Sequence, residues 1–381
     1  MNDDIDVLVA GAGPVGLMAA GELLRHGARV RLIDALPGPT ETSRALATHG
    51  RTLEIYDQIG VLDQILDRGQ PCTAFVRHTE GAEPVRYDFG YSDDPIRYEY
   101  NLMIDQRLTE QVLRDHLYEL GGRIEWNTRL AAIEPGPDHV TCRTIGPDGA
   151  ESTFGTPWLV ACDGAHSVVR KSLGIPLRGA STKTWLVADA EVHADLDRNA
   201  GHLLFGDGGA SLMFAYPSRG RWRIVDMTDA RHGEDTATVI PRLQRRLSAA
   251  TGQRITIGEP SWMSTFTIQQ RAVPTMRSGR CFLAGDAAHV HSPAGGQGMN
   301  TGMQDAFNLA WKLAMVIHGT CAEHLLDSYT PERSAVGDEV LKNAGRLTTI
   351  GTLKNPVGQV VRNLVGHVML GLRPVQHAMA D

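Results

Sequence analysis

The fold of this 381-residue chain is decided by the stretch IDVLVAGAGPVG, residues 5–16. An apolar run leads into three glycines, and helix-forming residues follow from Leu17 to His26. The glycines match the pattern G-x-G-x-x-G in its required place, after a strand and at the start of a helix. The first glycine permits a tight turn, the second lets the backbone approach a pyrophosphate, and the third lets helix and strand pack closely. We therefore expect a dinucleotide to contact Gly11, Ala12, Gly13, Pro14, Val15 and Gly16.

A second apolar run, residues 28–33, ends at Asp34, which lies 18 residues after Gly16. A carboxylate at this point accepts hydrogen bonds from an adenosine ribose. Strand, tight turn, helix, second strand and terminal acid together predict a βαβ unit that binds a dinucleotide. This unit alone does not distinguish NAD, NADP and FAD.

Composition excludes several classes of protein. Hydrophobic residues make up 42% of the chain, charged residues 21%, and the formal net charge is −7, which argues against nucleic-acid binding. No apolar stretch reaches the roughly 20 residues that span a bilayer, and the acidic residues 1–10 do not resemble a secretion signal. The five cysteines lack the spacings of zinc or redox sites. We expect a cytoplasmic protein with reduced thiols.

The rest of the chain alternates between helical and strand patterns. We expect helices within 43–70 and at 105–120, 236–252 and 300–318, short strands over 123–162, mostly strands over 175–275, and a strand at 281–284. These patterns predict a discontinuous first domain, a sheet-rich middle domain and a helical tail. The expected ranges are 1–174 with 276–330, then 175–275, then 331–381.

The helical tail is predicted over 331–349 and 356–372, and its second half carries one continuous apolar stripe. Such a stripe is typical of a helix that packs on the body of a protein. A self-association face, which would produce a homodimer, is the second interpretation, and a membrane-contacting face is poorly supported because the other side carries few charges.

Two further motifs make the sequence recognisable. Residues 161–170, ACDGAHSVVR, resemble an Asp-Gly motif, and GDAAH at 285–289 followed by PAGGQGMN at 293–300 resembles a Gly-Asp motif. With the glycine loop, they resemble the single-component FAD-dependent aromatic hydroxylases of the p-hydroxybenzoate hydroxylase fold. SRA at 43–45 and GRTLE at 50–54 are closest to the aromatic polyketide hydroxylases, and the similarity covers most of 5–335. The resemblance implies an α/β protein: a Rossmann-like (GR2-type) FAD-binding domain, a β-sheet-rich substrate domain and a helical C-terminal tail.

The resemblance also implies which residues bind non-covalent FAD. Asp286 would accept a hydrogen bond from a ribityl hydroxyl, and the glycine-rich loop would turn its N–H groups toward the N1/C2 carbonyl edge of the flavin ring. The residues assigned by these two motifs are Gly285, Asp286, Pro293, Gly295, Gly296, Gly298, Met299 and Asn300.

Other cofactor contacts rest on the resemblance alone. Arg44 and Gln106 match residues that contact FAD phosphate and ribityl oxygens, and Leu130 would offer its backbone to the adenine. Asp163 and Arg170 would serve FAD or a passing NADPH; the alternative is that they tie a strand end to a helix. Because the chain has a single dinucleotide fingerprint, NADPH or NADH is expected to visit only transiently.

His289 and His291 lie close to Asp286, which raises the question of a metal site. No acidic or sulfur ligand follows at the spacing of a metal site, so we expect no metal.

Alternate positions on the strands of the middle domain suggest an aromatic and aliphatic face for a planar substrate. The candidates are Trp185, Val187, Phe205, Leu212, Phe214, Tyr216, Trp222, Ile224, Trp262, Ser264 and Phe266. Core packing explains the same alternation, so both interpretations stay open. Tyr216 and His202 are weak candidates to assist loss of a phenolic proton, although packing or solvent exposure explains each of them as well.

The expected activity is that of a monooxygenase that uses FAD, NAD(P)H and O2 to hydroxylate a phenolic or quinonoid, polyketide-like polycycle through a flavin C4a-hydroperoxide. Epoxidation, Baeyer–Villiger insertion and oxidative decarboxylation are alternatives, and a non-catalytic flavin-bearing binding protein is a remote one. Many aromatic polyketide hydroxylases continue into a thioredoxin-like C-terminal domain, whereas this sequence ends at Asp381. We therefore expect any contacts made by that domain to be absent or replaced.

Overall fold

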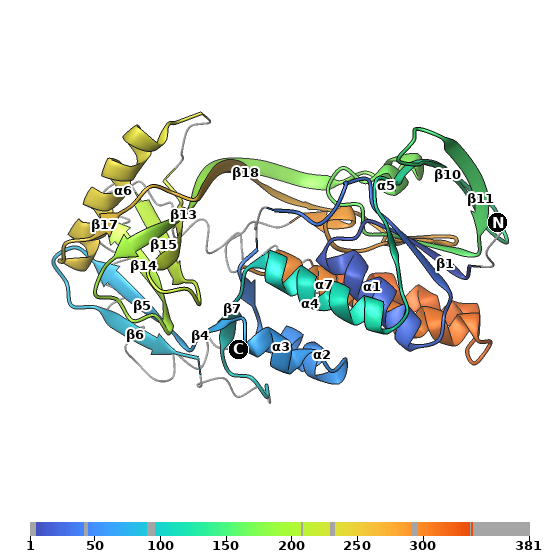
Figure 1. Cartoon of the computed structure of the whole chain (residues 1–381), viewed down its shortest axis with the longest axis horizontal. Coiled ribbons are helices and arrows are strands. Elements are labelled where there is room, and N and C mark those ends of the chain that lie inside the picture. The colour runs from blue at the N-terminus through green and yellow to red at the C-terminus, as the bar shows by residue number, and fades with distance from the viewer. Residues whose placement is uncertain are drawn as a thin grey trace.

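The computed structural model describes residues 5–41, 45–89, 96–206, 209–228, 233–290, 296–335 and 337. Two bodies, each built on a β-sheet, are joined by a pair of long antiparallel strands (Figure 1). These strands are β13 (Arg178–His193) and β18 (Trp262–Ala272). Three separate segments of the chain supply strands to the second body, so each body is assembled from segments far apart in the sequence.

The first body contains the expected βαβ unit. Its central sheet runs, in spatial order, β19 (Arg277–Ser278), β20 (Cys281–Leu283), β12 (Trp158–Ala161), β1 (Val7–Ala10), β2 (Val30–Ile33) and β8 (Ile124–Glu125). All neighbours are parallel except β19 and β20. Strands β1, β12 and β20 are buried throughout, as expected for a parallel sheet covered on both faces. The carboxyl ends of the parallel strands therefore lie along one edge of the sheet, where the glycine loop follows β1.

Three helices pack together beside this sheet (Figure 1). They are α1 (Pro14–Arg25), α4 (Gln106–Glu119) and α7 (Gly298–Ile317). Helix α4 begins where predicted because the Asp105 side chain accepts a hydrogen bond from the Arg107 N–H. The antiparallel strands β9 (Arg129–Pro135), β10 (Val140–Ile145) and β11 (Glu151–Thr156) pack against the same hydrophobic core. Short helices α5 (Val168–Ser172), η1 (Gly285–Ala287) and η2 (Glu323–Ser328) complete this body.

The second body is a large sheet in the order β21-β18-β13-β16-β15-β14-β5-β6, with β17 paired to β13. Its further strands are β14 (Ala200–Gly206), β15 (Gly209–Ala215), β16 (Arg221–Asp226), β17 (Thr256–Ile257), β21 (His289–Val290), β5 (Ala74–Thr79) and β6 (Val85–Asp88). Helix α6 (Thr236–Thr251) covers one face. Strands β5 and β6 lie outside the expected range 175–275, and the expected domain boundaries stay a prediction.

A small sheet of β3 (Ala47–Thr48), β7 (Asn101–Met103) and β4 (Gln70–Cys72) lies where the two bodies meet. Residues 43–70 were expected to be largely helical; their described part, 45–70, contains the short helices α2 (Gly50–Gln58) and α3 (Leu62–Leu66) between these strands. Within the described ranges, no helix has both the length and the apolar character needed to cross a membrane. The stripe at 356–372 and the homodimer inferred from it lie outside the described residues.

Candidate functional site

The glycine loop between β1 and α1 leaves room for a ligand at one glycine only. Gly11 has φ +101°, and a Cβ there would come 2.3 Å from the carbonyl oxygen of Cys162. A Cβ on Gly16 would come 1.7 Å from the carbonyl oxygen of Gly11. A Cβ on Gly13 would meet no protein atom within 4 Å. Gly11 and Gly16 are therefore required by packing, whereas the absence of a side chain at Gly13 leaves open space.

Helix α1 starts at this open side. Gly13 is its N-cap and Pro14 its first residue, and no side chain caps the helix. The N-terminal N–H groups of a helix and its dipole favour an anion. The loop thus fits the pyrophosphate of a dinucleotide.

Asp34 lies at the end of β2, as expected, and its carboxylate holds the glycine loop. Oδ2 accepts a hydrogen bond of 2.6 Å from the Ala12 N–H, and Oδ1 accepts one of 2.8 Å from the Leu36 N–H. Each oxygen retains a second lone pair for a ribose hydroxyl. The loop-holding bond was not foreseen from the sequence, and the ribose contact stays a prediction.

The Gly285–Asp286 turn lies directly against the glycine loop. Gly285 has φ +60°, and a Cβ there would come 2.8 Å from Cγ2 of Val15. Asp286 is exposed although both its neighbours, Gly285 and Ala287, are buried. An exposed carboxylate beside a dinucleotide loop fits a cofactor hydroxyl.

The loop before α7 is described only from Gly296 onward, so Pro293 and Gly295 lie outside the described residues, as does His291. Gly298 is the first residue of α7 and Met299 follows it. The buried side chain of Asn300 donates to the carbonyls of Ala47 and Gly296 and accepts from the His49 N–H. Asn300 therefore fixes the helix start against β3, and its contact with a flavin ring stays a prediction.

Gln106 occupies the first turn of α4. Its Oε1 accepts a hydrogen bond of 3.0 Å from the Ala45 N–H, and its Nε2 donates to Glu110. Arg44, the residue before Ala45, lies outside the described residues. The structure thus brings Gln106 next to the segment that carries Arg44, and the cofactor contacts of both stay predictions.

Asp163 and Arg170 hold the Asp-Gly segment in place. Asp163 Oδ2 accepts from the Val168 N–H at 2.7 Å, at the start of α5. The buried guanidinium of Arg170 donates to the carbonyls of Ala165 and Ala287. Oδ1 of Asp163 is buried without a hydrogen-bond partner, and burial raises the pKa of this carboxyl. These contacts match the structural alternative for both residues; Leu130, buried in β9, stays a predicted adenine contact.

One face of the large sheet collects the expected apolar side chains, which we call the aromatic face. It comprises Trp185, Val187, Phe205, Leu212, Phe214, Trp262 and Phe266. Ser264 pairs with Val187 and so lies on the same face. Phe214 also packs in a cluster with Leu46 and Met103, at the small sheet where the two bodies meet. The aromatic face is therefore turned toward the dinucleotide-binding body.

Trp222 and Ile224 do not belong to the aromatic face. The antiparallel register places Arg223 opposite Phe214 and Val225 opposite Leu212. Trp222 and Ile224 therefore point to the other side, where they pack with the residues of α6. Grouping them with Phe214 was wrong because alternation within one strand does not fix its register with the next.

Asp189 and Arg223, which the sequence did not single out, form a buried polar cluster with Tyr216 at the end of the aromatic face. Arg223 donates to both oxygens of Asp189 at 2.8 Å, and the Tyr216 hydroxyl donates to Asp189 Oδ2 at 2.8 Å. The guanidinium of Arg221 lies 4.3 Å from the ring centre of Tyr216. Burial raises the pKa of Tyr216, so this hydroxyl keeps its proton.

His202 lies on the α6 side of the sheet, since it pairs with Met213. It is buried and hydrogen-bonded to His78 at 2.9 Å, and burial lowers its pKa. His202 is therefore not placed to reach a substrate on the aromatic face, whereas the assistance expected of Tyr216 stays a prediction. His289 is bonded to Asp305 at 2.6 Å. Within the described ranges, no three His, Cys, Asp or Glu side chains cluster in a way that could hold a metal ion.

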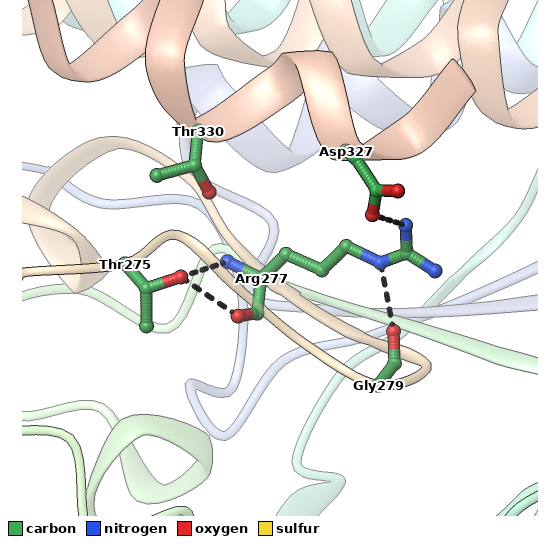
Figure 2. A pocket seen from close by; sticks show the side chains of 5 residues that line it. All are labelled: Thr275, Arg277, Gly279, Asp327 and Thr330. Atoms are coloured by element: carbon green, nitrogen blue, oxygen red, sulfur yellow. Dashed lines mark hydrogen bonds and ion pairs between the residues drawn. The ribbon is translucent and has the colours of Figure 1, made fainter. Parts of the chain in front are cut away.

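A separate pocket lies in the first body beside β19 and η2 (Figure 2). Its lining residues are Thr275, Arg277, Gly279, Asp327 and Thr330. Arg277 donates to Asp327 at 2.7 Å and to the Gly279 carbonyl at 3.0 Å, as Figure 2 shows. The polar groups of this pocket bond to one another or to neighbouring residues, and no residue expected to bind cofactor or substrate is among its lining residues.

A dinucleotide loop, an exposed aspartate turn and an aromatic sheet face define a flavoprotein of the aromatic-hydroxylase type. The chain belongs to the FAD-binding domain family, whose model matches residues 4–344. It is similar to the 6-methylpretetramide 4-monooxygenase of Streptomyces rimosus, with 46% identity over 374 residues, 98% of this chain and 67% of the relative.

Two solved structures show the same fold. The p-nitrophenol 4-monooxygenase of Pseudomonas putida superposes with a TM-score of 0.87 at 28% identity, covering 100% of this chain and 97% of that one. The anhydrotetracycline hydroxylase of Streptomyces rimosus gives a TM-score of 0.78 at 32% identity, covering 99% and 75%. The predicted fold and FAD are thereby confirmed, and the chain is a FAD-dependent monooxygenase that takes electrons from NAD(P)H.

Proposed function

We propose that this monooxygenase hydroxylates a phenolic or quinonoid polycycle of the polyketide type, bound between the aromatic face and FAD. The observation that carries the proposal is the aromatic face itself. Phe214, Trp262 and Phe266 are only partly buried on the side of the sheet turned toward the dinucleotide-binding body. Flat apolar side chains of this size suit a fused-ring substrate.

The substrates named for the similar proteins support the same class. The 46% identical relative is named for 6-methylpretetramide, and one of the solved structures for anhydrotetracycline. The other solved structure is named for p-nitrophenol, a single-ring phenol. A comparison of polycyclic with single-ring phenols is therefore the test that separates these cases.

We assign the cofactor to the edge where the glycine loop, Asp34 and the Gly285–Asp286 turn meet. The N-terminus of α1 would hold the pyrophosphate, Asp34 the adenosine ribose and Asp286 a ribityl hydroxyl. The N-terminus of α7, with Gly298 and Met299, would face the flavin ring. Bound there, FAD would supply the redox chemistry, in which two electrons from NAD(P)H let one atom of O2 enter the substrate while the other leaves as water.

The residues of this chain contribute orientation and exclusion of water rather than a nucleophile. The aromatic face holds the ring plane, and the Asp189–Arg223 pair anchors the strands that carry it. Tyr216 keeps its proton, so we assign no side chain as general base. Reactivity then comes from the electron-rich phenol of the substrate itself.

We also propose a cytoplasmic location, supported by five cysteines that form no disulfide. The functional test compares 6-methylpretetramide and other tetracyclic phenols with p-nitrophenol, using FAD-loaded enzyme, NADPH and air. We expect kcat/KM to be at least about a hundredfold higher for a tetracyclic phenol, because each added ring buries further apolar surface. Equal or greater efficiency with the single-ring phenol would reject the substrate class. Epoxide, ester or decarboxylated products would support the alternative oxygenations.

A further inference from the structure

Three buried charged side chains meet behind the Gly285–Asp286 turn; we call them the Asp305 cluster. Asp305 of α7 is 0% exposed, His289 3% and Arg333 8%. The Asp305 carboxylate accepts from His289 Nε2 at 2.6 Å and from Arg333 Nε at 2.8 Å. Arg333 also donates to the carbonyl of Thr301 at 3.3 Å. One buried anion is thus shared by groups from three separate segments of the chain.

The same carboxylate holds the turn itself, since Oδ2 of Asp305 accepts a hydrogen bond of 3.1 Å from the Gly285 N–H. Gly285 is packed on both sides. A Cβ on Gly302 of α7 would come 2.7 Å from Val15 and 3.0 Å from the Gly285 Cα. Helix α7, the turn and the glycine loop are therefore in direct contact at Gly285, and Asp286 is the next residue.

The position of the Gly285–Asp286 turn depends on the charge of one side chain, Asp305. Burial opposes the charged form of His289, but the nearby Asp305 outweighs that effect and raises its pKa. Removing the Asp305 carboxylate would leave Arg333 buried without its anion and the Gly285 N–H without its acceptor. The turn would then be free to move away from the glycine loop.

We propose that Asp305, itself held by His289 and Arg333, is a positioning residue for FAD: through its bond to the Gly285 N–H it fixes the Gly285–Asp286 turn at its distance from the glycine loop. The inference rests on the proposed cofactor site, because it acts through Asp286. No contact between Asp305 and the cofactor is needed.

The test compares Asp305→Asn with a matched control, Asp226→Asn. Asp226 is also 0% exposed and bonded to an arginine, Arg246, at 2.9 Å, but it lies in the large sheet beneath α6. Apoprotein of each variant is titrated with FAD and followed by quenching of flavin fluorescence, and its melting temperature is measured without FAD. Both variants should melt earlier than wild type. Only Asp305→Asn should bind FAD more weakly, by about ten- to a hundredfold, the loss expected for one bond to a charged group.

A double-mutant cycle with Asp286→Ala separates positioning from general destabilisation. If Asp305 acts through Asp286, adding Asp305→Asn to Asp286→Ala should weaken FAD binding by less than about threefold. Full additivity, or FAD binding by Asp305→Asn as tight as by Asp226→Asn, would overturn the inference.

Wild-type apoprotein that takes up no FAD would instead reject the proposed function. Should Asp305→Asn fail to fold, Arg333→Lys replaces it, because lysine keeps the cation but lacks the second nitrogen that reaches Thr301. Weakening of FAD binding by about threefold or more supports the inference, and unchanged binding overturns it.

Discussion

Replacing Gly13 with alanine separates cofactor binding from folding. The added methyl group meets no protein atom within 4 Å, and φ of −72° is accessible to alanine. Loss of a favourable N-cap costs about 0.5–1 kcal/mol, whereas the stiffer unfolded chain offsets about 0.4–1 kcal/mol. The free energy of unfolding of the apoprotein should therefore change by less than about 1 kcal/mol.

FAD binding should respond very differently, because the methyl group would occupy the space assigned to the pyrophosphate. Losing two hydrogen bonds to a charged phosphate, at about 1.5 kcal/mol each or more, removes about 3 kcal/mol. That loss corresponds to an affinity about a hundredfold lower. The assay is fluorescence titration of apoprotein with FAD, together with thermal melts of the apoprotein.

Gly16→Ala is the informative comparison, because its methyl group would lie 1.7 Å from the Gly11 carbonyl oxygen. This variant should fail to fold rather than fail to bind. If Gly13→Ala binds FAD within about threefold of wild type, the pyrophosphate does not lie against Gly13, and the reasoning is refuted.

Three further predictions concern the aromatic face and the buried polar groups. Trp262→Ala should raise the KM for a polycyclic substrate by roughly tenfold or more, because stacking and buried apolar area are lost. Trp222→Phe, on the opposite face, should leave this KM unchanged. Equal effects of the two variants in steady-state assays would place the substrate elsewhere. Tyr216→Phe should lower the free energy of unfolding, measured with denaturant, by about 1 kcal/mol, since one buried hydrogen bond to Asp189 is lost. The pH profile of kcat should stay unchanged. Loss of the basic limb of that profile would show that Tyr216 titrates during turnover. Asp305 raises the pKa of His289 in the folded protein, so the stability that this pair contributes is complete below the unfolded histidine pKa of about 6.5 and is lost as pH rises through the folded pKa. The melting temperature of the wild type should therefore fall over this pH range, and that of His289→Gln should not. A fall that persists in the variant would assign it to another group.

Local sequence patterns were sufficient for the dinucleotide-binding body. The glycine loop, Asp34 and the Gly285–Asp286 turn were predicted because each motif combines a strand end with a backbone requirement that few residue types satisfy. Helices α4 and α6 follow their amphipathic patterns, and α6 has an N-cap at Asp235 and a glycine at its end.

Long-range pairing accounts for what the sequence did not reveal. Strand β5 joins the large sheet by pairing with β14, more than a hundred residues away, and no local pattern encodes that choice. The side chain of Asn300 bonds to backbone about 250 residues distant, and Asp189 meets Tyr216 only once the register of the strands is fixed. A one-residue change of register turns a side chain to the opposite face, which is why Trp222 was misplaced.

The most direct test of the proposed hydroxylation supplies ¹⁸O2 to the purified FAD-loaded enzyme, with NADPH and a tetracyclic phenol, and measures the ¹⁸O content of the product. We expect a hydroxylated product that carries one ¹⁸O atom, formed in proportion to the NADPH consumed. NADPH oxidation that yields only hydrogen peroxide with every tetracyclic phenol tried, or a product whose new oxygen comes from water, would contradict it.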